Sequence, residues 1–88
     1  MYVSSELFIT LPAGVALHAR PAGSFVKVAL GFKSRITVSH GDRQADAKSI
    51  LAVLALGADS GSEIRVRAEG EDADAALEAV RNWSDGLQ

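Results

Sequence analysis

The stretch EIRVRAE at residues 63–69 is the clearest structural signal in this sequence. Ile64, Val66 and Ala68 alternate with charged residues, and a period of two is typical of a strand with one buried and one solvent-facing side. Such strands form antiparallel sheets that are covered by helices on one face only. The stretch therefore predicts a half-exposed antiparallel sheet.

Three earlier segments are also predicted as strands: residues 6–11, 35–39 and 43–45. The first alternates around Leu7, Ile9 and Leu11, and a Pro-Ala-Gly turn follows it. The other two flank the sequence HGD at residues 40–42, which is typical of a tight turn and predicts a hairpin.

Apolar residues at steps of three and four predict three helices. The first has Pro21 in its first turn and ends near Gly31. The second begins around Ser49 and ends at Gly57, and the last opens with acidic residues at 71–74. The resulting order predicts an α+β fold, with a four-stranded antiparallel sheet and three helices packed on one face.

Composition predicts one globular domain spanning residues 1–88, since 48% of the residues are apolar and 23% are charged. The absence of cysteine excludes disulfides and thiolate zinc sites, and two distant histidines make poor metal ligands. No metal or cofactor is expected. Because the sequence shows neither a membrane-length apolar run nor a secretory signal, we expect a cytoplasmic protein that does not insert into membranes. A monomer is the default expectation.

Charge is distributed unevenly along the chain. Residues 1–48 carry a net charge of +3 and residues 49–88 a net charge of −5. Nucleic-acid binding is disfavoured, because it requires a strong basic excess and is usually accompanied by stacking aromatics. The split favours a basic surface that meets an acidic protein partner, although a chance distribution of charges is the alternative.

The second helix is apolar around most of its circumference. Its apolar residues are Ile50, Leu51, Val53, Leu54 and Leu56. They cannot all face one core, so part of this surface should be exposed and available for docking. The alternative is that a small core and the loop after Gly57 bury all five.

The stretch ALHARPA at residues 16–22 places a histidine where a helix begins. A helix start presents unpaired backbone N–H groups and the positive end of the peptide dipole, which together favour an anion. The neutral imidazole of His18 has a free lone pair and can attack phosphorus, while Arg20 can hold phosphoryl oxygens. The stretch therefore predicts a phosphate site that contains its own nucleophile.

Three blocks in order resemble HPr, the histidine-containing phosphocarrier family of the bacterial phosphoenolpyruvate:sugar phosphotransferase system. The blocks are LHARPA with Phe25-Val26, AKSIL with LGA, and AEGED. Together they span essentially the whole chain, and their order and spacing are specific. The resemblance implies an open-faced β-sandwich and a covalent carrier that is not itself an enzyme.

The resemblance also implies roles for individual residues. His18 matches the histidine that takes a phosphoryl group on Nδ1 from enzyme I, which phosphoenolpyruvate charges, and passes it to enzyme IIA domains. Arg20 matches the arginine beside the phosphohistidine, and Ala19 and Pro21 belong to the supporting helix start. The partner surface is expected to comprise Lys27, Lys48, Ile50, Leu51 and Leu54.

Ser49 matches a serine that HPr kinase/phosphorylase modifies in many Gram-positive bacteria, where the modification slows sugar transfer and recruits a transcriptional regulator. A serine at a helix start is also a common cap, because its hydroxyl satisfies a backbone N–H group. The two roles are compatible, and the sequence does not say whether the kinase is present.

The loop before His18 departs from the family pattern. The family usually has glycine where this chain has Ala16, and the nearest glycine, Gly14, comes two residues earlier. If the usual glycine has a positive φ, Ala16 would be strained there, so the backbone is expected to take another path. His40, in contrast, is interpreted as an inert turn residue.

Two alternatives stay open at this point. One is a regulatory HPr paralogue, of a nitrogen-type phosphotransfer system or another phosphorelay, with the same histidine chemistry and a different recipient. The other is a small α/β binding module in which His18 merely caps a helix.

Overall fold

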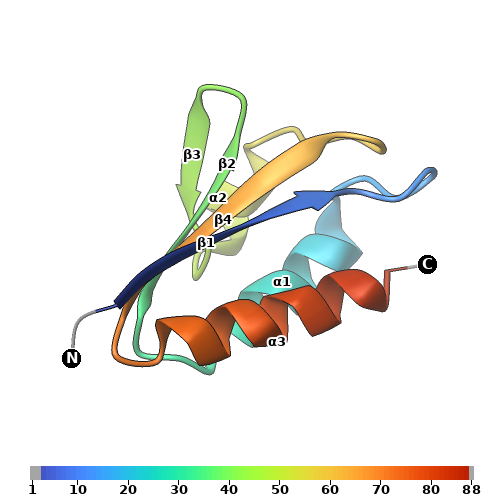
Figure 1. Ribbon diagram of the computed structural model, residues 1–88. Coiled ribbons are helices and arrows are strands. Elements are labelled where there is room, and N and C mark those ends of the chain that lie inside the picture. Colours follow the sequence, from blue (N-terminus) through green and yellow to red (C-terminus); the bar gives the residue numbers. More distant parts are fainter. Residues whose placement is uncertain (1–2, 88) are drawn as a thin grey trace.

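The computed structural model describes residues 3–87 and has the predicted element order. The elements are β1 (Val3–Thr10), α1 (Ala19–Leu30), β2 (Arg35–His40), β3 (Arg43–Asp46), α2 (Ile50–Leu54), β4 (Glu63–Gly70) and α3 (Ala73–Asp85). Figure 1 shows α1 and α3 packed beneath the sheet. The predicted fold class, a four-stranded antiparallel sheet with three helices, is confirmed.

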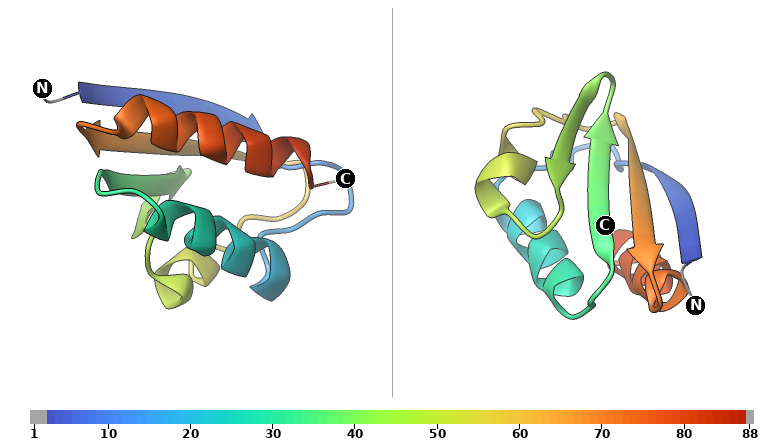
Figure 2. Two further views of the ribbon diagram at one scale, coloured as in Figure 1. Left: turned by 90° about the horizontal axis from the view of Figure 1, so that it is seen from below. Right: turned by 90° about the vertical axis from the view of Figure 1, so that its left-hand side faces the viewer.

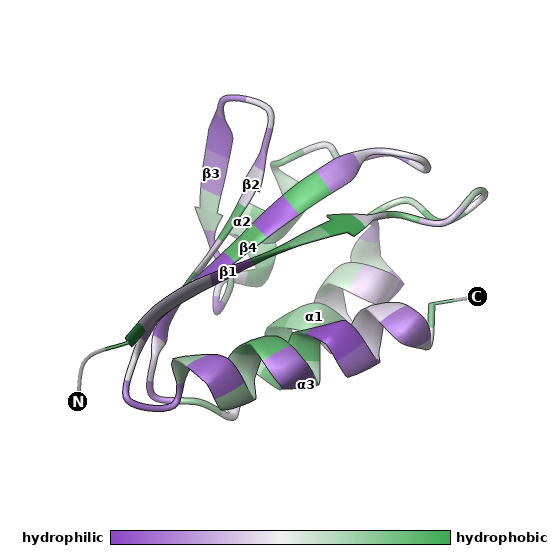
Figure 3. Ribbon diagram, in the orientation of Figure 1, coloured by the Kyte–Doolittle hydropathy of each residue, from purple (hydrophilic) through white to green (hydrophobic). Residues whose placement is uncertain are grey.

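The strand at 63–69 lies inside the sheet, where it pairs on both sides. The strand order is β1-β4-β2-β3, and every pair is antiparallel. Val66 of β4 lies opposite Leu7 of β1 and opposite Val38 of β2. The alternation of apolar and polar residues along β4 is visible in Figure 3. Its apolar residues face the core, because Ile64, Val66 and Ala68 are all fully buried.

The helices cover one face of the sheet and leave the other face open, as the two views of Figure 2 show. Phe25 of α1 and Val80 of α3 are fully buried between these layers. The Phe25 ring also lies against the Trp83 ring, with 4.9 Å between the ring centroids. The largest fully buried side chains are Phe25, Leu11, Ile36, Ile64, Val38, Val53, Val66 and Val80.

Two element boundaries differ from the prediction by three residues. β1 begins at Val3, three residues before the predicted Glu6, because its first residues pair with the end of β4. The serines in that segment give no apolar alternation, so only strand pairing reveals it. α2 ends at Leu54, short of the predicted Gly57, where φ is +66°.

Asp72 joins the start of α3 to the turn before β2. Its carboxylate accepts hydrogen bonds from the Ser34 hydroxyl and from the backbone N–H groups of Lys33 and Ser34, the latter two at 2.9 Å. These bonds, that of the Ser34 hydroxyl above all, hold the pKa of Asp72 below its ordinary value. Gly70 makes room for this junction, because a Cβ there would lie 2.6 Å from Ser34 Oγ.

Replacing Asp72 with asparagine should remove a stabilising contribution that depends on pH. A carboxyl whose pKa is lowered by folding stabilises the protein above its unfolded pKa of about 3.9 and loses that effect as pH falls through the folded value. Urea unfolding should therefore show Asp72→Asn less stable than the parent protein at pH 7, with the difference closing towards pH 2. Asp42→Asn, at the exposed hairpin tip, is the control. If the difference in unfolding free energy between Asp72→Asn and the parent protein stayed constant from pH 7 to pH 2, it would contradict a stabilising role for the Asp72 carboxylate.

Candidate functional site

His18 is the N-cap residue of α1 and is exposed to solvent. Its backbone is extended, with φ −87° and ψ −169°, and its side chain makes no capping hydrogen bond. The side-chain capping role that the binding-module alternative gave to His18 is therefore not present. The imidazole is held at the helix start by the backbone, in a residue that is exposed to solvent.

Two backbone N–H groups remain available beside this ring. The amide of Ala22 donates the first bond of the helix to the His18 carbonyl at 2.9 Å, and the His18 amide donates to the Ala16 carbonyl at 2.8 Å. Pro21 has no N–H group. By helix geometry, the amides of Ala19 and Arg20 are left without intrahelical acceptors, next to the ring.

The loop before His18 is unstrained, because its backbone does not place Ala16 in the left-handed region. No non-glycine residue among residues 3–87 has a positive φ, and the left-handed position in this loop is taken by Gly14 at φ +81°. Leu17 anchors the loop, since it is 2% exposed and its amide donates to the Ala58 carbonyl at 2.9 Å. Gly14 thus takes the left-handed position of this loop, and His18 lies at the helix start.

A surface hollow of about 700 Å³ lies in front of this helix start. His18 and Arg20 line it together with Ser24, Gly86 and Leu87. The last three were not predicted as site residues. Ser24 lies one helical turn after Arg20, so its spacing could have indicated it. Gly86 and Leu87 have no such signal, because only the packing of α3 on α1 brings them here.

Positive charge lies along the exposed side of α1. Arg20 is exposed and makes no ion pair or hydrogen bond with residues 3–87, so its guanidinium is free to meet an anion. Lys27 is also exposed and follows seven residues later, on the same helix face and about 10 Å along the axis. Both cations are therefore open to an anionic or acidic group that approaches this side of α1.

The exposed apolar surface predicted for the second helix is present. Ile50 is 38% exposed, Leu51 77% and Leu54 36%, whereas Val53 and Leu56 are buried. The alternative in which all five are buried is wrong. We refer to Ile50, Leu51 and Leu54 as the apolar patch.

Ser49 and Lys48 both make local contacts at the start of α2. Ser49 is the N-cap, and its hydroxyl accepts a hydrogen bond from the Ala52 amide at 3.3 Å, so the predicted cap is confirmed. The Lys48 ammonium donates to the Phe32 carbonyl at 2.7 Å, in the turn after α1. The ammonium keeps two further N–H donors, and contact between Lys48 and a partner stays a prediction.

His40 is not the inert turn residue that its sequence context suggested. It is the last residue of β2, is half-buried, and has Nδ1 3.2 Å from the Leu56 carbonyl oxygen. The sequence could not reveal this contact, because it joins a strand end to the chain just after α2.

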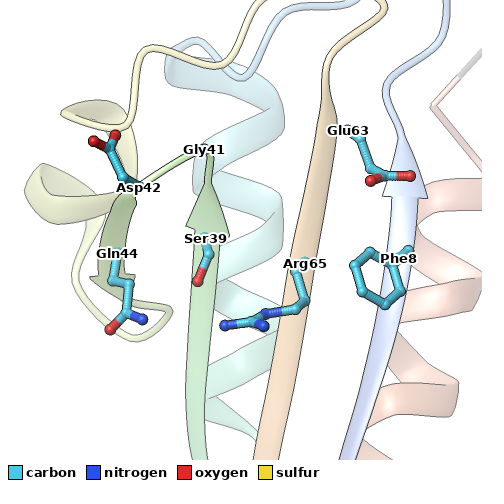
Figure 4. A pocket seen from close by; sticks show the side chains of 7 residues that line it. All are labelled: Phe8, Ser39, Gly41, Asp42, Gln44, Glu63 and Arg65. Carbon is cyan, nitrogen blue, oxygen red and sulfur yellow. The ribbon is translucent and has the colours of Figure 1, made fainter.

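A second hollow, of about 310 Å³, lies on the open face of the sheet, away from the helices (Figure 4). Arg65 extends across it towards Ser39 on β2, and Phe8 lies on the opposite side. The Arg65 Nε atom is already 3.9 Å from a Glu6 carboxylate oxygen. This hollow is separate from His18.

Residues 3–87 contain no group of three or more histidine, aspartate or glutamate side chains that could hold a metal ion. None of the helices in this part of the chain has the length and hydropathy needed to cross a bilayer.

Comparison with known proteins gives a consistent result. The family model described as "PTS HPr component phosphorylation site" matches residues 3–84. Phosphocarrier protein HPr of Mycoplasma capricolum is 43% identical over 67 residues, which are 76% of this chain and 75% of that protein.

A second relative is much longer. The multiphosphoryl transfer protein of Xanthomonas campestris is 45% identical over 82 residues, and these cover 93% of this chain but only 10% of that protein. Among solved structures, that of HPr-C-His from Thermoanaerobacter tengcongensis superimposes with a TM-score of 0.89 at 34% identity, covering 94% of this chain and 93% of that one.

Proposed function

The chain belongs to the HPr family of phosphocarriers of the phosphotransferase system, and from this premise we propose that His18 carries a phosphoryl group from phospho-enzyme I to enzyme IIA domains during sugar uptake. The single observation that carries the proposal is the exposed, uncapped His18 ring at the start of α1. A nucleophile in this position meets its phosphoryl group beside backbone donors that are already oriented.

The proposed chemistry is a pair of phosphoryl transfers. A lone pair on the His18 ring attacks phosphorus on the donor enzyme, and the bond from phosphorus to that enzyme breaks as the new P–N bond forms. In the second step, a nucleophile of the recipient attacks, the P–N bond breaks, and the imidazole is regenerated. Following the family resemblance, the ring atom is Nδ1.

The chain's own contribution is electrostatic. The amides of Ala19 and Arg20 and the Arg20 guanidinium face the charge that the phosphoryl oxygens bring to His18. At an exposed site, each such interaction contributes about 0.3–1 kcal/mol. The group is thereby oriented without being trapped, as a carrier requires, and most of the transition-state stabilisation is left to the partner proteins.

The apolar patch is the proposed docking surface for both partners. Burial of two of its side chains would contribute roughly 3–6 kcal/mol before the costs of association. Lys27, on the neighbouring helix, adds a positive charge that speeds encounter with an acidic partner. The patch and Lys27 thus provide affinity and steering around the reacting histidine.

Ser49 is the proposed regulatory position, modified by an HPr kinase/phosphorylase. A phosphate on its hydroxyl would add a charge of about −1.5 to −2 directly before Ile50. That charge disfavours an acidic partner at the patch. The modified protein would accept phosphate at His18 more slowly and would offer a changed surface to a transcriptional regulator.

A second candidate is the same carrier with a regulatory recipient. The similarity to a multiphosphoryl transfer protein shows that a sequence of this kind also forms a small part of a much longer protein. Transfer from phosphorylated protein to a panel of sugar-specific and nitrogen-type enzyme IIA domains would separate the two candidates.

Incubation with phosphoenolpyruvate and enzyme I should add one phosphoryl group to the chain. Intact-mass measurement should show this gain, and a phosphoramidate predicts that it is lost in acid and kept in base. Peptide mapping should place it within residues 16–22. Enzyme I omitted from the mixture is the control. No gain, or a gain that survives acid, would contradict the proposal.

A further inference from the structure

We propose that His40 and Arg43, on the β2–β3 hairpin, are positioning residues for phosphoryl transfer. They hold the chain segment that ends α2, and through it they orient both the apolar patch and the loop before His18. The inference rests on the proposed function, since the patch matters only if partners dock there. Neither residue touches the reacting group.

Two hydrogen bonds join the hairpin to the end of α2. Arg43 donates from Nη1 to the Ala55 carbonyl at 3.1 Å, and His40 Nδ1 lies 3.2 Å from the Leu56 carbonyl. Helix ends leave carbonyls without intrahelical donors, and Ala55 is the C-cap of α2, while Leu56 is the residue after it. An imidazole with hydrogen on Nδ1 can donate whether neutral or protonated, so this bond does not require a charged ring.

The same short segment reaches the phosphorylation loop. Two residues after Leu56, the Ala58 carbonyl accepts the hydrogen bond from the Leu17 amide at 2.9 Å. Leu17 and Ala58 are 2% and 1% exposed, so their contact is packed as well as hydrogen-bonded. Residues 55–58 therefore receive donors from the hairpin on one side and from the residue before His18 on the other.

α2 needs such external support. It has five residues, which is far below the length at which a helix is stable by itself. Val53 is its only fully buried residue, while Leu51 is 77% exposed and Leu54 36% exposed. The exposed surface of the patch side chains makes no contact with the core and so does not hold the helix in place. The direction of the patch consequently depends on the bonds at the two ends of α2, Ser49 at one end and the hairpin at the other.

The test compares four single variants and one double variant. Arg43→Met and His40→Phe remove one hydrogen bond each while keeping side-chain bulk, and the double variant removes both. Arg43→Lys keeps a positive donor. Arg35→Met is the matched control, since Arg35 is an exposed arginine at the other end of β2.

Enzyme I kinetics give the first readout. The double variant should raise the KM for this chain about tenfold and change kcat by less than about twofold, because docking is impaired and the His18 chemistry is intact. Arg43→Lys should recover most of the loss caused by Arg43→Met, and Arg35→Met should behave like the parent protein.

Amide hydrogen exchange gives a second readout that needs no partner. The Leu56 and Leu17 amides should exchange several-fold faster in Arg43→Met and His40→Phe, while amides of β4 stay protected. An unchanged KM in the folded double variant, an equal effect of Arg35→Met, or unchanged exchange at Leu17 would each overturn the inference. If the parent protein takes up no phosphate, the proposed function fails, and the exchange measurements still decide whether the hairpin holds this segment.

Discussion

His18→Ala should take up no phosphoryl group from phosphoenolpyruvate and enzyme I, because alanine provides no lone pair to attack phosphorus. Phosphoryl uptake should fall below detection while the fold survives. The His18 side chain is exposed and makes no capping hydrogen bond, so its loss should change the free energy of unfolding by no more than about 0.5 kcal/mol. Intact-mass spectrometry and urea unfolding measure the two expectations separately.

The chain offers a histidine control for this experiment. His40→Ala removes the other histidine and should still take up one phosphoryl group at completion. Because His40 is proposed to position the docking surface, the uptake should be slower than in the parent protein. Residual acid-labile phosphate on His18→Ala, or its absence from His40→Ala, would place the acceptor elsewhere.

Phe25→Ala should lower the free energy of unfolding by about 3–5 kcal/mol, the usual cost of removing a fully buried aromatic side chain. Phe25 is 0% exposed, and its ring lies 4.9 Å from that of Trp83 with 52° between the ring planes. The substitution opens a cavity between α1 and α3 and also removes a tilted aromatic pair. The free energy of unfolding of a small domain is about 5–15 kcal/mol, so the expected loss is a large part of the total.

Urea unfolding followed by circular dichroism and by the fluorescence of Trp83, the only tryptophan, measures this loss. Phe8→Ala is the matched control, because Phe8 is 56% exposed on the open face of the sheet. Phe8→Ala should lower the free energy of unfolding by less than about 1 kcal/mol. Similar losses for the two variants would show that Phe25 does not have the central packing role assigned to it.

The strands and helices were predictable where burial imposes a regular period. Ile64, Val66 and Ala68 identified β4 because a one-sided sheet must alternate apolar and polar residues. The first three residues of β1 were not predictable, because their pairing with β4 satisfies backbone groups and leaves no pattern in the side chains. Similarly, α2 is shorter than its apolar pattern suggested, and Gly57 takes a turn conformation instead.

The candidate site was predictable in part for the same reason. His18, Arg20 and Pro21 lie within one helical turn, so local spacing was sufficient to bring them together. The loop before them was harder to anticipate, since Gly14 takes the left-handed conformation that was expected to strain Ala16. Gly86 and Leu87 reach the same hollow only because α3 packs along α1.

By itself, the sequence determined most of each strand, the helices, the apolar patch and the histidine at a helix start, because each of these depends on residues that are close together in the chain. Only the tertiary structure decided what holds these parts in register. The contacts of Asp72 with Ser34, of His40 with Leu56 and of Leu17 with Ala58 join segments that are far apart in sequence. Their geometry follows from the packing of helices on the sheet, which no local pattern of residues encodes.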